Sequence, residues 1–212
     1  MRLLVVGAGG HAKVVIDAAE AAGHTIAAVL GSTSDVREIM GHPVTTPAEA
    51  PDIAALGADG FIVAIGDNRT RARRFAELTA TGLAPATVIH PSAIVGTDVV
   101  IGPGTFLAPG VIVNTGARIG VDVILNTGCA VDHDVEVGDH SHVGPRTALC
   151  GGAAIGEGAL LGVGSCVVPL ARVGAWSVVG AGAAVVGDLP GGSVCVGVPA
   201  RAIHTSQEAD RG

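Results

Sequence analysis

The second half of the chain repeats every six residues, and this period leaves few folds open to it. From Ala93 to Asp188 the sequence divides into sixteen consecutive hexads without an insertion. The third position of each hexad is Val, Ile or Leu, and the fourth is most often Gly, Ala, Asn or Asp. A period of six fits neither an α-helix nor a plain alternating strand. It predicts short strands with a turn at each end, each pointing one aliphatic side chain inward.

Residues 1–88 follow a different pattern, in which strand and helix signals alternate. Strands are predicted at residues 3–6, 25–30 and 60–65, with a first helix at about residues 12–22. This βαβ order predicts a small parallel sheet of the Rossmann-like kind. We therefore expect two domains, residues 1–88 and residues 89–212.

A second helix is predicted from a cap at Asp67 or Asn68 through Leu78. Four arginines lie in it, and we expect them to occupy largely its polar faces. They are Arg69, Arg71, Arg73 and Arg74.

Composition argues against several classes of protein. The formal net charge is −7 and Lys13 is the single lysine, which argues against a nucleic-acid surface. The four cysteines form no CxxC pair, so reduced thiols are expected rather than a disulfide framework. Turn signals interrupt every apolar run before it is long enough to span a membrane, and the first strand is too short for a signal sequence. We expect a cytoplasmic protein that does not enter the membrane.

A glycine-rich turn lies between the first predicted strand and the first helix. Gly7–Ala12 satisfies G-x-G-x-x-A, a pattern of dinucleotide sites. However, no Asp or Glu ends the second predicted strand to hold a ribose hydroxyl, and the domain is short for two mononucleotide halves. A phosphate or diphosphate at the start of this helix remains the favoured ligand, and a purely structural turn is the alternative.

The hexads resemble those of the left-handed parallel β-helix acyltransferases. In that family three hexads make one triangular coil, so sixteen hexads imply about five coils. Exposed ends of such a solenoid need capping. The first domain would cap one end, and the tail Leu189–Arg201 would cap the other. This tail resembles the family's terminal segment, which lies beside bound coenzyme A.

Three further segments resemble the nucleotide-sugar acetyltransferases. They are Gly7–Val15, Ala64–Arg69 and His90–Ala93. The resemblance implies an acetyl-CoA-dependent enzyme that N-acetylates a nucleotide-linked 4-amino-4,6-dideoxy sugar, with O-acetylation of sialic acid or a related sugar as the alternative. It also implies a homotrimer. In one respect the chain departs from this family. Members usually carry acidic residues that recognise the nucleotide base just after the second strand, and here that stretch, residues 31–35, holds only one acidic residue. The implied substrate-binding residues in the first domain are Gly9, Gly10, His11, Lys13, Asp67, Asn68 and Arg69.

Three histidines lie close together in the repeat, at His133, His140 and His142. The resemblance places the general base on His133, and an imidazole is a fitting base for attack on a thioester. Asp134, or with less support Asp132, would orient its ring. His140 is expected to be a solvated surface side chain.

Gly151 follows His133 by three hexads, which is one full coil. Adjacent coils are about 4.8 Å apart, so Gly151 is expected to stack beside the base. Its N–H is the candidate oxyanion donor, a position that the family uses in this way, and a plain structural turn is the alternative.

His142 is half a coil from His133, so the two are not expected to share a site within one chain. The resemblance makes His142 a substrate or acetyl contact that faces His133 of a neighbouring subunit in the trimer. It further implies that coenzyme A runs along Gly151, Gly162, Gly180 and Ala181, with Arg201 near its phosphates.

A zinc enzyme of the γ-carbonic-anhydrase kind is the rival from another class. Its three histidine ligands are separated by about two coils and then five residues, as the resemblance to that family implies. In this chain His133, His140 and His142 are separated by seven and two residues, so we expect no metal. A non-catalytic scaffold is a further alternative, but it leaves the Asp132–Asp134 segment without a role.

Overall fold

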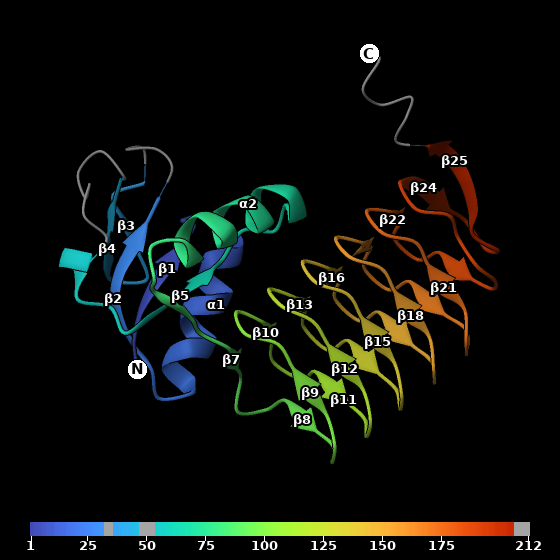
Figure 1. The fold of residues 1–212 in the computed structure, drawn as a ribbon, viewed down its shortest axis with the longest axis horizontal. Helices are drawn as coiled ribbons and strands as arrows, with labels where there is room; N and C mark the ends of the chain where they lie inside the picture. Colours follow the sequence, from blue (N-terminus) through green and yellow to red (C-terminus); the bar gives the residue numbers. More distant parts are fainter. Residues whose placement is uncertain (32–35, 47–53, 206–212) are drawn as a thin grey trace.

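The computed structural model describes residues 1–31, 36–46 and 54–205. Within these ranges the chain forms a small α/β domain followed by a β-helix of stacked coils (Figure 1). No helix in the described part of the chain combines the length and the apolar character needed to cross a membrane.

The first domain contains a six-stranded sheet in the order β3-β4-β2-β1-β5-β6. Neighbouring strands are parallel, except that β3 and β4 are antiparallel. The strands are β1 (Arg2–Val6), β2 (Thr25–Leu30), β3 (Glu38–Ile39), β4 (His42–Thr45), β5 (Gly60–Val63) and β6 (Ala84–Pro85). The parallel sheet was predicted. The short strands β3, β4 and β6 were not, because so few residues carry too little pattern to be recognised.

Two helices flank this sheet, and a short 3-10 turn covers Ala54–Leu56. Helix α1 spans Gly10–Ala21, so it begins slightly before the predicted start. Helix α2 spans Asn68–Thr79, and the carboxylate of Asp67 caps it by accepting the N–H of Thr70 at 2.8 Å. The predicted cap is therefore confirmed.

The β-helix has three flat faces that meet at three corners (Figure 1). Partners along each face are three hexads apart, as Phe106 and Ile124 show, which confirms the predicted coil. The first face contains β7 (Val88–Ile89), β10 (Phe106–Leu107), β13 (Ile124–Leu125), β16 (His142–Val143), β19 (Leu160–Leu161), β22 (Val178–Val179), β24 (Ser193–Val196) and β25 (Arg201–Thr205). The second contains β8 (Ile94–Val95), β11 (Ile112–Val113), β14 (Ala130–Val131), β17 (Ala148–Leu149), β20 (Cys166–Val167) and β23 (Ala184–Val185). The third contains β9 (Val100–Ile101), β12 (Arg118–Ile119), β15 (Glu136–Val137), β18 (Ala154–Ile155) and β21 (Arg172–Val173).

The third position of each hexad forms the core of the β-helix. These side chains are buried from Leu107 to Val185. Val95 is 39% exposed, and Ile101 is only partly buried. Their strands are the last of their sheets, so no further coil covers them. The C-terminal end is closed differently, because β25 folds back antiparallel on β24.

A buried ion pair joins the first domain to the β-helix. Arg71 was expected on a polar face of its helix, but its side chain is 1% exposed, so this expectation was wrong. Its Nε lies 3.3 Å from Oδ2 of Asp122, which is equally buried at the corner before β13. The guanidinium also donates to the carbonyl oxygens of His140 and Ile65. Arg71 points into the domain interface because α2 packs there, which a sequence pattern of one helix cannot reveal.

Candidate active site and nucleotide pocket

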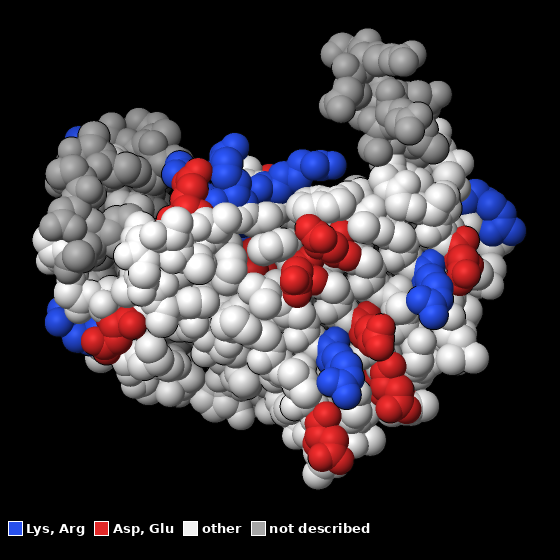
Figure 2. Space-filling model, in the orientation of Figure 1, with Lys and Arg blue, Asp and Glu red and all other residues white. Residues whose placement is uncertain are grey.

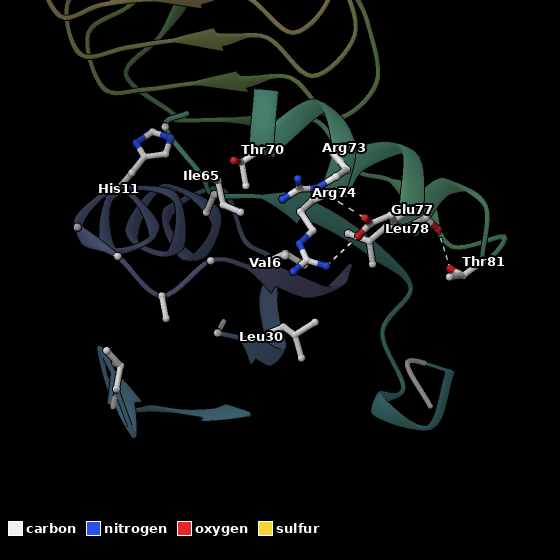
Figure 3. Close-up of a pocket in the computed structure, with 18 residues that line it drawn as sticks. Val6, His11, Leu30, Ile65, Thr70, Arg73, Arg74, Glu77, Leu78 and Thr81 are labelled. Atoms are coloured by element: carbon white, nitrogen blue, oxygen red, sulfur yellow. Dashed lines mark hydrogen bonds and ion pairs between the residues drawn. The ribbon is translucent and has the colours of Figure 1, made fainter. Parts of the chain in front are cut away.

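A cavity of about 880 Å³ opens at the carboxyl ends of β1, β2 and β5 (Figure 3). In parallel sheets this edge is where ligands bind, at the point where strand order reverses about the central strand. The lining residues come from the glycine-rich turn, from the ends of the strands and from α2. They are Val6, Gly7, Ala8, Gly9, Gly10, His11, Leu30, Gly31, Val36, Ala64, Ile65, Gly66, Thr70, Arg73, Arg74, Glu77, Leu78 and Thr81.

The glycines of the turn differ in what they do. Gly7 has a φ of +124° and a Cβ there would stand 2.6 Å from the carbonyl oxygen of Ala64, so its role is structural. A Cβ at Gly9 or Gly10 would meet no atom within 4 Å. Gly9 caps α1 without a side-chain hydrogen bond, and no acidic residue occupies the first turn. This open helix start has the properties of an anion site.

His11 lies at one end of this cavity (Figure 3). Burial, assisted by the charge of Arg71, lowers its pKa to about 4, so the ring is neutral near pH 7. Its edge packs against Phe106 with ring centres 5.6 Å apart. Its buried Nε2 has no hydrogen-bond partner among the residues that the structure describes.

Helix α2 contributes a charged wall that the sequence analysis did not assign to the site. Thr70, Arg73, Arg74 and Glu77 line the cavity. Figure 2 shows basic side chains gathered over α2, in a protein that is otherwise acidic. The spacing of the arginines was visible in the sequence, but only the packing of α2 reveals which of them face the cavity.

The remaining predicted substrate residues do not line this cavity. Lys13 is exposed on α1. Asp67 caps α2, and the buried Asn68 donates to the carbonyl oxygens of Gly158 and Ala159. The guanidinium of Arg69 stacks over the ring of Trp176 at 4.7 Å. Residues 32–35, which belong to the stretch considered for base recognition, lie outside the described residues.

His133 and Asp134 form a dyad at the corner between the second and third faces. Nδ1 of His133 lies 3.0 Å from Oδ2 of Asp134, so Nδ1–H donates and Nε2 is left as the basic nitrogen. The hydrogen bond to Asp134, with the charge of Asp132, raises the pKa of His133. Asp134 has a φ of +58°, a conformation that Asp tolerates well. The arrangement is that of a general base with an orienting carboxylate.

Asp132 has a different task from Asp134. Its carboxylate accepts from the side-chain amide of Asn114 at 2.9 Å and from the backbone N–H of His133 at 2.8 Å. The Asn114 hydrogen bond is the main reason why the pKa of Asp132 is lowered, and the N–H of Gly151 adds a smaller effect. Asp132 thus fixes the backbone of the turn, while Asp134 contacts the ring.

Gly151 lies directly beside His133, one coil further along the chain, as predicted. The N–H of Gly152 donates to the carbonyl oxygen of His133 at 3.0 Å, which aligns the two turns. A Cβ on Gly151 would stand 2.5 Å from Nε2 of His133. The absence of a side chain therefore leaves the basic nitrogen accessible.

His142 lies on the first face and turns towards the first domain. Burial, assisted by Arg71, lowers its pKa to about 4. Nδ1–H of this neutral ring donates to the carbonyl oxygen of Gly66 at 3.4 Å, and Nε2 accepts from the amide of Asn126 at 3.0 Å. Its ring centre is 6.2 Å from that of His11. Asn126 was not predicted as a site residue, since an Asn in a hexad turn is an ordinary turn residue.

His140 was expected to be solvated, and this was wrong. Its Nδ1 lies 2.8 Å from Oδ2 of Asp122, and its side chain is 20% exposed. The ring also packs edge-on against Phe75 of α2. His140 is drawn into the domain interface because Asp122 needs partners there.

Of the predicted coenzyme residues, Gly151 lies beside His133, whereas Gly162, Gly180 and Ala181 lie at a different corner of the β-helix. Gly162 and Gly180 stack between the first and second faces, and a Cβ on Gly162 would stand 2.6 Å from the nitrogen of Ala181. Their N–H groups donate to Val179 and Cys195 of the next coil. Arg201 is exposed at the start of β25. Within one chain the structure therefore separates Gly162 and Gly180 from the His133 dyad.

No group of three or more His, Cys, Asp or Glu side chains placed to hold a metal ion was found among the described residues.

Comparisons with known proteins agree with this architecture. The family described as the PglD N-terminal domain matches residues 2–78. Over 111 residues the chain is 38% identical to UDP-N-acetylbacillosamine N-acetyltransferase of Bacillus subtilis (strain 168), a match that spans 48% of this chain and 48% of that protein. The match therefore covers about half the length of this curated relative.

Among the solved structures that cover nearly the whole chain are two from related proteins. A variant of perosamine N-acetyltransferase from Caulobacter crescentus, in which a histidine is replaced by asparagine, was solved with CoA and GDP-perosamine. It is 40% identical, with a TM-score of 0.92 over 96% of this chain and 97% of that chain. The acetyltransferase domain of PglB from Neisseria gonorrhoeae FA1090, solved with acetyl coenzyme A, is 33% identical, with a TM-score of 0.88 over 95% and 98%. The chain belongs to the family of nucleotide-sugar acetyltransferases, and its second domain is a left-handed parallel β-helix.

Proposed function

We propose that the protein transfers the acetyl group of acetyl-CoA to the 4-amino group of a nucleotide-linked 4-amino-4,6-dideoxy sugar. The observation that supports this most directly is the His133–Asp134 dyad beside Gly151, with Nε2 of His133 left accessible. A relative that is 40% identical was solved with CoA and GDP-perosamine, which favours an amino sugar over a sugar hydroxyl as acceptor.

In the proposed reaction, Nε2 of His133 removes a proton from the amine as its nitrogen bonds to the thioester carbonyl carbon. Asp134 holds Nδ1–H and stabilises the imidazolium that forms. Collapse of the tetrahedral intermediate breaks the carbon–sulfur bond. The imidazolium returns its proton to the departing thiolate, so the products are the acetamido sugar and coenzyme A.

Gly151 is the proposed oxyanion donor. Its N–H makes a small contribution to lowering the pKa of Asp132. We propose that the thioester oxygen takes over this donor when acetyl-CoA binds. Asp132 keeps the hydrogen bonds from Asn114 and from the N–H of His133.

The glycine-rich turn is the proposed site of the nucleotide diphosphate. Gly9 and Gly10 present a helix start that faces open space, and His11 lines the same cavity. The adjoining segment Lys13, Asp67, Asn68 and Arg69 was predicted to take part. None of the four lines the cavity: Lys13 is exposed on α1, Asp67 caps α2, and Asn68 and Arg69 contact the β-helix, so we expect them to act indirectly.

We propose that the active enzyme is a homotrimer with sites between subunits. His133 and the pair Gly162 and Gly180 occupy different corners of one β-helix. A coenzyme can bridge both sets only where two chains meet. In this arrangement His142 of one chain contacts the substrate near His133 of its neighbour, while Ala181 and Arg201 contact coenzyme A. A cytoplasmic location remains a prediction from the sequence.

The test is thiol release from acetyl-CoA with GDP-, UDP- and dTDP-linked 4-amino-4,6-dideoxy sugars. We expect one amino sugar to turn over rapidly, and His133→Gln to lower kcat by about 10²-fold or more. His90→Gln is the matched control, because that ring bonds Ser92, outside the site. Turnover of sialic acid or a related sugar in place of every amino sugar would overturn the N-acetyltransferase assignment.

A further inference from the structure

We propose that the paired side chains of Arg74 and Glu77 read the base of the bound nucleotide and select guanine over uracil, thymine and adenine. The inference rests on the proposed function in one respect, which is that the cavity of the first domain holds a nucleoside diphosphate. It adds the recognition element and the identity of the base.

The pair lies away from the proposed phosphate site in the same cavity. Figure 3 shows His11 at one end, with Glu77 and Thr81 towards the other and Arg74 pointing into the space between them. Nη1 of Arg74 lies 2.8 Å from Oε2 of Glu77, as expected of residues three apart on one helix face. A nucleotide with its phosphates on the glycine-rich turn would extend its base towards this pair.

The walls at this end suit a flat aromatic ring. Val6, Leu30 and Leu78 are apolar, and all three are buried. Val36 adds a further apolar side chain on the lining. Apolar walls with a few polar groups that fix orientation are the usual form of a small-molecule site.

The polar groups of the pair match one edge of guanine. Guanine presents in sequence one acceptor, O6, and two donors, N1–H and the N2 amino group. Arg74 can donate to O6, and the two oxygens of Glu77 can accept from N1–H and N2–H. Because one partner in each contact is charged, these hydrogen bonds are stronger than neutral ones.

The other common bases match this pair less well. Uracil and thymine present O4, N3–H and O2, so the third group is an acceptor facing the carboxylate of Glu77. Adenine presents an amino group to Arg74 and an acceptor to Glu77. An unmatched polar group at a recognition site is what produces discrimination between such ligands.

The ion pair between Arg74 and Glu77 contributes little to the stability of the fold. The side chains of Arg74 and Glu77 are 39% and 49% exposed, and Nε of Arg73 lies 3.8 Å from Oε1 of Glu77. Exposed pairs of this kind contribute little to folding. Two arginines about one carboxylate leave a net positive charge, which also favours an anionic nucleotide.

The experiment is isothermal titration calorimetry of the intact protein with GDP, IDP, UDP and dTDP. IDP lacks only the N2 amino group, so it isolates one contact to Glu77. We expect GDP to bind roughly 10- to 100-fold more tightly than UDP, dTDP or IDP, the range for a hydrogen bond to a charged group. Equal binding of GDP and UDP, or no binding of any of the four, would overturn the proposal.

Glu77→Gln tests the role of the carboxylate. A glutamine keeps one acceptor but turns the other into a donor, which suits uracil O2. We therefore expect the variant to lose most of its preference for GDP over IDP, and its preference for GDP over UDP to fall at least tenfold. Glu136→Gln, on the outer side of the third face, is the matched control. Unchanged preferences in Glu77→Gln would contradict the assignment, whatever the native protein prefers.

Different results would refute the proposed N-acetyltransferase function and the proposed recognition of guanine. Selective GDP binding with no acetyl transfer to any amino sugar would refute the proposed function and leave base recognition standing. Turnover of a UDP-linked amino sugar with tight UDP binding would refute base recognition and leave the proposed function standing.

Discussion

Nε2 of His133 lies 2.5 Å from the point where a Cβ of Gly151 would stand. The two residues are three hexads apart and occupy equivalent places in consecutive coils, aligned by the hydrogen bond from Gly152 to His133. The fold therefore brings a base and a residue without a side chain into contact by repetition alone. Access to the base depends on that glycine.

Gly151→Ala should lower kcat by about 10²-fold, because the added methyl group displaces or covers the basic nitrogen. The φ of Gly151 is not in the left-handed region, so alanine fits its backbone and thermal stability should change little. Steady-state kinetics and thermal melting check this. Gly187→Ala, at an exposed position with open space around its Cβ, serves as the control. Full activity in Gly151→Ala would show that the chemistry takes place elsewhere.

Asp134→Asn should shift the acid limb of the pH–rate profile to lower pH and reduce kcat. The hydrogen bond that His133 donates to Asp134 is the main cause of the raised pKa of His133, so removing the charge of Asp134 lowers that pKa. Activity requires the neutral imidazole and is lost as pH falls through this pKa. Profiles of kcat/KM from pH 5 to 9 measure the limb. Asp98→Asn is the matched control, since Asp98 has the same left-handed turn conformation two coils earlier. If the acid limb of Asp134→Asn lies at the same pH as that of the native protein, titration of His133 does not produce this limb.

Arg71→Met should destabilise the protein by roughly 3–5 kcal/mol, because it leaves Asp122 charged and buried without its partner. Burial raises the pKa of Asp122, and the interactions with His140 and Arg71 oppose that rise. Urea unfolding measures the loss. The control Arg118→Met, which removes an exposed arginine on the third face, should lower the free energy of unfolding far less. The double variant Arg71→Met with Asp122→Asn should recover part of the lost free energy of unfolding. An equal loss in the single and the double variant would show that Arg71 stabilises the protein through packing alone.

The protein should lose stability as pH falls from about 6.5 to about 4. His11 and His142 both have pKa values lowered to about 4, chiefly by burial. Between 4 and 6.5 the unfolded chain binds protons at these rings that the folded chain does not. Their contribution is therefore complete above pH 6.5 and lost progressively below it. Urea unfolding at pH 7.5 and pH 5 measures the slope. His142→Gln should flatten it, whereas His90→Gln should not.

The β-helix could be predicted almost completely from the sequence. A hexad repeat specifies both the short strands and the inward column, and with three hexads per coil, as the family resemblance implies, the register from His133 to Gly151 follows from counting. The dyad was predicted for the same reason, because His133 and Asp134 are neighbours in the chain. Contacts within one coil or between adjacent coils are local or periodic, and a sequence displays both.

Contacts between the two domains were not predictable in this way. Arg71 and His140 each seemed to belong on the surface, yet both meet at Asp122 in the domain interface. The choice of Arg74 and Glu77 as lining residues likewise depends on the side of the sheet that α2 covers. These contacts join residues with no common period.

The sequence pattern by itself determined the short strands of the repeat and the order of the two domains, and the family resemblance of the sequence supplied the left-handed coil and, with it, the pairing of His133 with Gly151. Only the tertiary structure decided which arginine of α2 is buried, which ones face the cavity, and that Nε2 of His11 lacks a partner among the described residues. The physical reason is that a repeat fixes its own neighbours through hydrogen bonds of constant spacing. The docking of one domain on another is set by side-chain packing and by the need to satisfy buried charge.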